Sequence, residues 1–171
     1  ADEMKRLIDV FPRSAHPMGV LSALTSALTA FNPKAVDVKS KEEMDLAAEL
    51  MIAKFSHLCA WTYRKTLGLP INHGDNSLNY VENFYKMAFR LPNEEFHMDP
   101  VVVAALDKLL ILHADHEQNC STSTVRMVGS AHTGLFASIS AGVSALWGPL
   151  HGGANQAVIE MLELIDHGLV S

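Results

Sequence analysis

The sequence lacks the features of a membrane or secreted protein. None of its apolar runs approaches the roughly 18 consecutive residues that a transmembrane helix needs. The charged segment 1–6 shows no signal-peptide pattern of basic, apolar and small-residue regions. Only two cysteines are present, and the separation of Cys59 from Cys120 favours reduced thiols over a structural disulfide. We therefore expect an intracellular, cytoplasmic protein with no membrane partner.

Basic residues are also scarce. Thirteen Lys and Arg stand against 19 Asp and Glu, which gives a net charge of −6, and no basic stripe is present. Proteins that bind nucleic acids neutralise phosphates with clustered Lys and Arg, so we expect no nucleic-acid partner. The chain is instead 49% apolar and 19% charged, as is typical of a globular domain. Its nine histidines are many for 171 residues and are the first indication of chemistry.

Apolar residues recur at three- and four-residue spacing along nearly the whole chain, which predicts an all-α fold. We see no internal repeat, low-complexity tract or domain linker. The expected helices cover 18–30, 41–67, 135–147 and 153–165, with one from after Ser77 towards Arg90 and one from Pro100 into His113 and His116.

Local signals mark where two of these helices begin and end. Ser40 followed by Glu43 is a capping-box pattern, and Gly68 is typical of the position after a helix C-terminus. Asp99 precedes Pro100 as an N-cap residue precedes a proline at the first helical position, where the missing N–H is harmless.

Three helices are expected to pack closely against other surfaces. The residues predicted to face inward are Val102, Leu106, Leu109 and Leu110 in the helix from Pro100, and Ala157, Val158, Met161 and Leu162 in the last helix. The helix over 135–147 carries mostly small residues between its apolar ones, so it can approach its neighbours closely. We expect that helix to be buried on several sides or to lie in a subunit interface.

The candidate functional residues are histidines in two short segments. His113 and His116 are three residues apart and would share one helical face. His151 lies between two apolar helices and is followed by two glycines, which let backbone approach whatever lies beside the ring. At a helix start, the positive end of the helix dipole opposes protonation of an imidazole, which favours a neutral hydrogen-bond donor suited to stabilising a developing enolate.

Other interpretations of these residues compete with catalysis. His113 and His116 are equally consistent with a helix-end pair bonded to carbonyls or solvent. Known helical zinc patterns place histidines four apart or in another order, so we expect no metal site. No Gly-x-Ser-x-Gly turn supports a Ser/His/Asp triad. The remaining histidines are interpreted as surface or structural residues: His16, His57, His73, His97, His132 and His167.

Two long motifs carry a family resemblance. Residues 113–126 read HADHEQNCSTSTVR and residues 148–158 read GPLHGGANQAV, and both closely resemble citrate synthases. Residues 11–18, FPRSAHPM, also look like that family, so the resemblance covers essentially the whole chain. The first motif is similar to the bacterial hexameric, type II-like group rather than the mitochondrial dimeric one.

The resemblance implies an all-α fold with a large and a small domain and active sites between them. Residues 1–171 would be part of the large domain, without the N-terminal region and the small domain. The implied reaction condenses acetyl-CoA with oxaloacetate and water to give citrate and CoA, at entry to the tricarboxylic acid cycle. It needs no cofactor beyond acetyl-CoA as a substrate. The family's catalytic aspartate and substrate arginines lie downstream of these residues, so we expect the isolated chain to be inactive.

The resemblance also implies roles for five residues. His151 would donate a hydrogen bond to the thioester oxygen as the enolate forms, while a carboxylate base removes the methyl proton. His116 matches the family's oxaloacetate-binding histidine, and His113 would shape the same pocket. Asn119 and Ser121 would orient His151 without contacting the substrate themselves.

Two alternatives remain open. The 2-methylcitrate synthases share GPLHGGAN but usually differ in the first motif. A non-catalytic α-helical oligomerisation module would use the same helices for self-association alone. Family dimers pack helices from this region against their symmetry mates, so we expect self-association as a dimer or as a hexamer of dimers.

Overall fold

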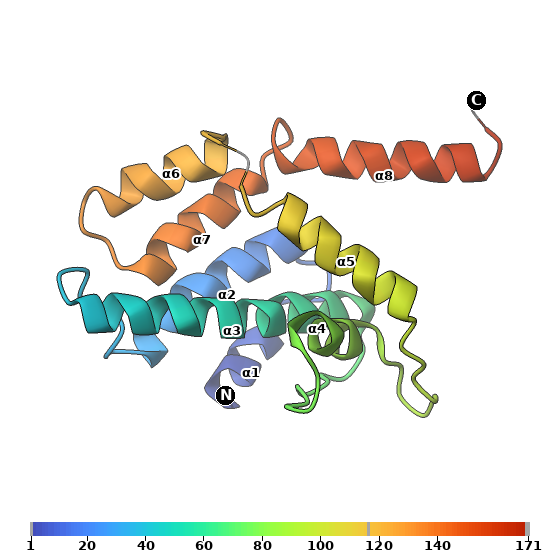
Figure 1. Cartoon of the computed structure of the whole chain (residues 1–171), viewed down its shortest axis with the longest axis horizontal. Helices are drawn as coiled ribbons and strands as arrows, with labels where there is room; N and C mark the ends of the chain where they lie inside the picture. Colours follow the sequence, from blue (N-terminus) through green and yellow to red (C-terminus); the bar gives the residue numbers. More distant parts are fainter. Residues whose placement is uncertain (1, 116, 170–171) are drawn as a thin grey trace.

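The computed structural model describes residues 2–115 and 117–169 (Figure 1). Within them the chain forms eight helices and no strand, so the predicted all-α fold is confirmed. None of these helices is both long enough and apolar enough to cross a bilayer. The helices are α1 (Asp2–Asp9), α2 (Pro17–Phe31), α3 (Lys41–Leu67), α4 (Tyr80–Phe89), α5 (Pro100–Leu112), α6 (Cys120–Gly129), α7 (Leu135–Leu146) and α8 (Gly152–Asp166).

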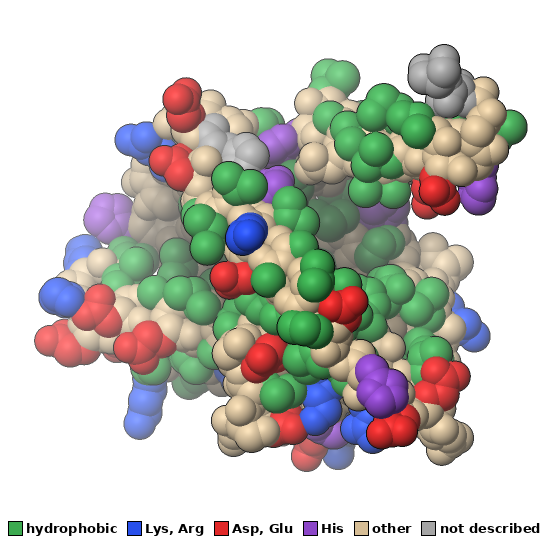
Figure 2. Space-filling model, turned by 45° about the vertical axis from the view of Figure 1, so that its right-hand side comes forward, with side chains coloured by type: hydrophobic (Ala, Val, Ile, Leu, Met, Phe, Trp, Pro, Cys, Tyr) green, Lys and Arg blue, Asp and Glu red, His purple; other side chains and the backbone are tan. Residues whose placement is uncertain are grey.

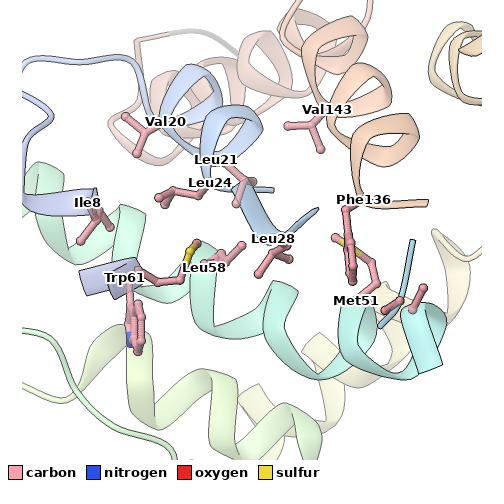
Figure 3. Packing of buried hydrophobic residues seen from close by; sticks show 13 residues of the cluster. Ile8, Val20, Leu21, Leu24, Leu28, Met51, Leu58, Trp61, Phe136 and Val143 are labelled. Carbon is pink, nitrogen blue, oxygen red and sulfur yellow. The ribbon is translucent and has the colours of Figure 1, made fainter. Parts of the chain in front are cut away.

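Helices α1, α2, α3 and α7 enclose the main hydrophobic core (Figure 3). Leu24 and Leu28 of α2 meet Phe136 of α7, and all three side chains are at most 1% exposed. Leu58 of α3 and Ile8 of α1 complete the cluster. Burying a side chain of this size stabilises the fold by about 1.5–3 kcal/mol. The core therefore fixes α7 against the first half of the chain.

The predicted ends of α3 are confirmed, although its capping box is only half formed. The Ser40 side chain accepts the backbone N–H of Glu43, and Gly68 follows the helix at a φ of 70°, a left-handed conformation that favours glycine. The Glu43 carboxylate accepts the N–H groups of Val36 and Asp37 instead of that of Ser40. The Ser40 N–H already donates to the Asp37 carbonyl. The Glu43 carboxylate therefore stabilises the loop that precedes α3.

The sequence pattern did not indicate α1 and α6. Helix α1 has eight residues and buries Met4 and Ile8, one turn apart on the same face. Helix α6 is rich in Ser and Thr, which favour helices weakly, and it is capped by the Asn119 side chain. Such short helices are stabilised mainly by packing.

Two predicted buried faces are exposed, and that part of the prediction is wrong. Helices α5 and α8 contain no buried residue: Val102, Leu109 and Leu110 are 41–51% exposed. Val158 and Leu162 of α8 are 49% and 50% exposed, and Figure 2 shows hydrophobic side chains on this surface. Helical periodicity tells which residues share a face, but burial needs a second surface, and no described segment covers these faces.

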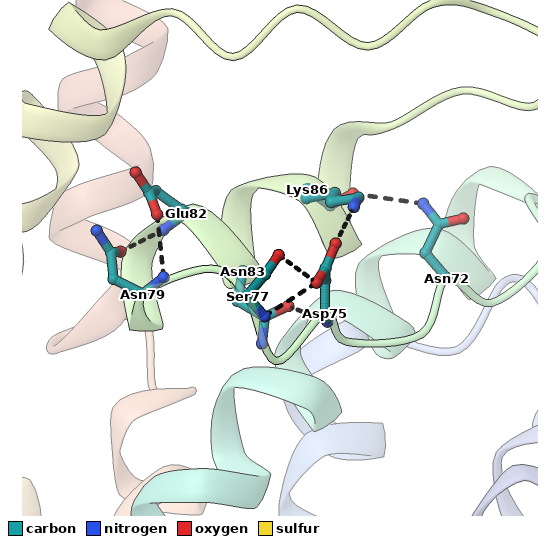
Figure 4. A network of polar contacts seen from close by, with 7 residues as sticks. All are labelled: Asn72, Asp75, Ser77, Asn79, Glu82, Asn83 and Lys86. Atoms are coloured by element: carbon teal, nitrogen blue, oxygen red, sulfur yellow. Dashed lines mark hydrogen bonds and ion pairs between the residues drawn. The ribbon is translucent and has the colours of Figure 1, made fainter.

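A polar network ties the loop after α3 to α4 (Figure 4). The Asp75 carboxylate accepts hydrogen bonds from the Lys86 ammonium at 2.6 Å and from the side chain and backbone of Ser77 at 2.6 and 3.0 Å. The Asp75 N–H donates to the Asn83 side chain at 2.9 Å. The hydrogen bond from Lys86 and, next, those from Ser77 hold the pKa of Asp75 well below its usual range.

We predict that Asp75→Asn lowers the melting temperature most at neutral pH. A carboxyl whose pKa is lowered by folding stabilises the fold above its unfolded value of about 3.9 and loses that contribution as pH falls through the folded value. The difference in melting temperature between the two proteins should therefore stay constant from pH 7 down to about pH 4 and shrink as pH falls further towards the folded pKa of Asp75. A difference in melting temperature that stays unchanged below about pH 4 would contradict the network's electrostatic role.

Candidate functional site

Helix α7 lies between α2 and α6 and sets the frame of the site (Figure 1). Small residues let α2 and α7 approach: the Ser22 hydroxyl lies 3.0 Å from that of Ser140 and 2.7 Å from that of Ser144. The Ser140 hydroxyl also donates to the Ser22 carbonyl at 2.8 Å. The prediction that 135–147 is buried on several sides is confirmed by its packing against α2 and α6, and its place in a subunit interface stays a prediction.

Gly142 brings α7 equally close to α6. A Cβ at this position would lie 2.6 Å from Cγ2 of Val125 and 3.6 Å from the Ser121 carbonyl oxygen. An alanine here would force the Val125 side chain or one of the two helices to move. This contact places Ser121, in the first turn of α6, beside the middle of α7.

The turn between α7 and α8 carries His151. His151 occupies the N-cap position of α8, as predicted, but its side chain makes no capping hydrogen bond. Its backbone N–H donates to the Gly148 carbonyl at 3.0 Å. A Cβ at Gly152 would lie 2.2 Å from the Leu146 carbonyl oxygen, so backbone fills the space that a side chain needs. The His151 imidazole makes its side-chain hydrogen bond outside α8.

The Ser121 hydroxyl is a side-chain partner of the His151 ring. Its Oγ lies 2.9 Å from Nε2 of His151 and donates to the Gly142 carbonyl at 2.9 Å. A hydroxyl has one proton, so Nε2 carries a proton and donates to Oγ whenever Ser121 donates to Gly142. When the Ser121 proton turns to Nε2 instead, a neutral ring carries its own proton on Nδ1. The pair thus has two hydrogen arrangements with the same heavy-atom geometry.

Asn119 acts on its own helix. Its side chain accepts the backbone N–H of Thr122 at 2.9 Å and so caps α6. Replacing such a cap by Ala typically costs about 1 kcal/mol. Asn119 therefore acts on the His151 ring indirectly, by fixing the helix turn that carries Ser121.

The first histidine motif is not helical at His113. Helix α5 ends at Leu112, and Nδ1 of His113 lies 2.7 Å from the Leu109 carbonyl oxygen. The expectation that the apolar helix carries through His113 is wrong. The turn is closed by the Ala114 N–H on the Ile111 carbonyl. His116 lies outside the described residues.

The cysteines and the possible metal ligands add nothing to this centre. Both Cys59 and Cys120 are free thiols, as predicted. Burial raises the pKa of Cys59 to about 12, so this thiol is protonated at neutral pH. In the part of the chain that the structure describes, no three His, Cys, Asp or Glu side chains are arranged to hold a metal ion.

Comparison with known proteins decides the family. The profile of the family described as "Citrate synthase, C-terminal domain" matches residues 1–169. This chain belongs to the citrate synthase family. The match includes both segments that meet at Ser121 and His151, so the family resemblance of the two motifs is confirmed.

Two bacterial citrate synthases are close relatives in sequence. "Citrate synthase 1" of Mycobacterium tuberculosis is 54% identical over 162 residues, which is 95% of this chain and 38% of the relative. "Citrate synthase" of Corynebacterium glutamicum is 50% identical over 169 residues, which is 98% of this chain and 39% of the relative. The chain therefore spans about two-fifths of the length of these curated relatives.

Solved citrate synthase structures share the fold. The crystal structure from Pyrobaculum aerophilum superposes with a TM-score of 0.81 at 34% identity, over 94% of this chain and 40% of the other. The Thermoplasma acidophilum enzyme, in a ternary complex with carboxymethyl coenzyme A and oxaloacetate, superposes with a TM-score of 0.82 at 29% identity, over 95% of this chain and 41% of the other. The helices described above are thus arranged as in citrate synthases.

We predict that Gly142→Ala lowers the free energy of unfolding by about 1–3 kcal/mol, because its Cβ overpacks the contact with Val125. The opposing gain in helix propensity is about 1 kcal/mol. Urea unfolding followed by circular dichroism measures the change. The double variant Gly142→Ala/Val125→Ala should recover stability, and a double variant no better than the single one would contradict the steric explanation.

Proposed function

We propose that this chain supplies part of the active site of a citrate synthase that condenses acetyl-CoA with oxaloacetate and water to citrate and CoA. The observation that carries the proposal is the contact of Ser121 with His151. Two segments 30 residues apart, each matching a family motif, meet there at a 2.9 Å hydrogen bond. Membership of the citrate synthase family supports the same reaction.

The proposed chemistry of His151 follows from its hydrogen arrangement. When the Ser121 hydroxyl donates its hydrogen bond to Nε2, the neutral imidazole carries its proton on Nδ1 and donates it as a hydrogen bond to the thioester oxygen while a base removes the methyl proton. The α-proton of a thioester is weakly acidic, so the base and the oxyanion donor must act together. Ser121 then holds the tautomer that donates towards the substrate.

The other parts of the proposed site come from the family resemblance. His116 would contact oxaloacetate, His113 would shape the same pocket, and Asn119 would support Ser121. The catalytic aspartate and the substrate arginines would come from other parts of the parent, so we expect no activity from this chain alone. We assign these residues to part of the large domain, with acetyl-CoA as a substrate and with no cofactor or metal.

The finer assignments follow from the motifs. HADHEQN favours the bacterial hexameric, type II-like group, a cytoplasmic enzyme of the tricarboxylic acid cycle. The curated relatives, both bacterial, support that direction. A 2-methylcitrate synthase is the runner-up, because it shares the second motif.

Replacement of His151 by Ala in the full-length parent should lower thiol release from acetyl-CoA and oxaloacetate by about 10²-fold or more, the loss expected for one oxyanion donor. His97→Ala is the matched control, because His97 is an exposed histidine outside both motifs. The rate of thiol release by Ser121→Ala should fall between the rates of His151→Ala and the parent. The imidazole remains in this variant, but no hydroxyl donates to Nε2 to keep the ring proton on Nδ1.

Comparison of two substrates tests the reaction itself. Faster thiol release with propionyl-CoA would move the assignment to 2-methylcitrate synthase. No release from the parent with either substrate would overturn the enzymatic proposal.

The exposed apolar faces of α5 and α8 support a second role in self-association. Ile111 and Leu112 of α5 are 66% and 70% exposed, and Ile159 of α8 is 57% exposed. Surfaces of this kind are typical of contact with another protein surface. We propose that copies of the parent pair through these faces, as a dimer or as a hexamer of dimers, with α7 buried inside each copy.

The chain itself should therefore sediment as a species larger than its 18.7 kDa monomer. Introducing charge on one face of α8, with Val158→Lys and Leu162→Lys together, should shift it towards monomer because both side chains are half-exposed. Lys substitution at the exposed Met127 of α6 is the control. A monodisperse monomer of the unsubstituted chain would remove the proposed interface.

A further inference from the structure

We propose that His16, Trp147 and Gly19 are positioning residues for His151, holding the far end of the turn that carries the imidazole. None of the three touches the proposed reacting atoms. The functional meaning of this clamp rests on the proposed citrate synthase activity, whereas its geometry does not.

The first contact of the clamp is a stack of two rings. The rings of His16 and Trp147 lie 5.0 Å apart between centroids, with 27° between their planes. Nδ1 of His16 accepts the backbone N–H of Met18 at 3.2 Å and so caps the start of α2. This hydrogen bond fixes the orientation of the His16 ring, and the fixed ring presents a flat surface to the indole.

Gly19 lets the indole lie against the first turn of α2. A Cβ at Gly19 would lie 3.2 Å from Cζ3 and 3.3 Å from Cη2 of Trp147. Contacts this short require the indole to move. Glycine at this position therefore has a steric reason that concerns Trp147 rather than the backbone of α2.

Trp147 lies at the start of the turn that leads to His151, so its stack with His16 anchors that turn. Trp147 is the C-cap residue of α7, and the turn from Gly148 to Leu150 follows it directly. Pro149 is exposed and Leu150 is 100% exposed, so their side chains do not anchor the turn. The turn is held by backbone hydrogen bonds, by Trp147 at its start and by the contact of His151 with Ser121 at its end.

Loss of the stack between His16 and Trp147 should loosen the contact of His151 with Ser121. Helix α2 is fixed in the core by its buried Leu24 and Leu28. The stack therefore ties the turn after α7 to a rigid helix. Without the stack the turn gains freedom, and His151 spends less time in the geometry that its role needs. Misplacement of a catalytic group by about 1 Å can cost on the order of 10²-fold in rate.

Three variants separate the clamp from general stability. Trp147→Ala removes the stack, Trp147→Phe keeps an aromatic ring on His16, and His16→Asn keeps a capping acceptor at α2 without a ring to stack. Phe31→Ala is the matched control, because Phe31 is also aromatic, is 44% exposed against 48% for Trp147, and lies at the opposite end of α2.

The first readout is the kinetics of the full-length parent. We expect Trp147→Ala and His16→Asn each to lower kcat by roughly 10-fold or more with a smaller change in KM, because the oxyanion donor is misplaced while the other substrate contacts remain. Trp147→Phe should restore most of kcat, and Phe31→Ala should match the parent. Equal losses for Trp147→Ala and Phe31→Ala would overturn the proposal.

The second readout needs no activity. In the ¹⁵N-labelled 171-residue chain, the His151 ring signals report whether Nε2 stays hydrogen-bonded to Ser121. We expect Trp147→Ala and His16→Asn to change these signals and Trp147→Phe to leave them near those of the unsubstituted chain. Unchanged His151 signals in Trp147→Ala would overturn the clamp, whether or not the parent proves to be a citrate synthase.

Discussion

The arrangement of the candidate site depends on how closely α7 can approach its two neighbours. On one side, Ser140 and Ser144 share hydrogen bonds with Ser22 of α2. On the other side, Gly142 leaves no room for a Cβ beside Val125 of α6. A larger residue at these positions would push α2 or α6 outward. Helix α6 carries Ser121, and the end of α7 leads to His151. The distance between α6 and α7 therefore decides whether these two side chains meet.

The site is therefore assembled by packing rather than by neighbours in sequence. Asn119 caps the helix that carries Ser121, and the backbone at Gly152 fills the space beside the end of α7. These constraints converge on one hydrogen bond between Ser121 and His151. One nitrogen of the ring is thus committed to Ser121, and in the proposed function the other would donate to the substrate. Such preorganisation is what stabilisation of a developing oxyanion requires.

Sequence reasoning succeeded where the signal is local. Ser40 and Gly68 marked the ends of α3 because capping and left-handed termination are properties of single residues. The inward faces of α5 and α8 were wrong, because burial depends on a covering surface that periodicity does not reveal.

The candidate site was predictable only in part, for the same reason. His151 stood out by its glycines, but its pairing with Ser121 came from family resemblance rather than from spacing. His16 was interpreted as a surface or structural histidine, because no local pattern connects it to Trp147, 131 residues later in the chain. Contacts between distant helices of this kind follow from the packing of α2 against α7.

A crystal structure of the full-length parent with oxaloacetate and carboxymethyl coenzyme A tests the central claim most directly. The carboxylate of this compound stands in for the enolate of acetyl-CoA. We predict that Nδ1 of His151 lies within about 3 Å of a carboxylate oxygen while Nε2 keeps its contact with Ser121. An inhibitor carboxylate held by other groups, with the His151 ring beyond hydrogen-bond reach, would contradict it.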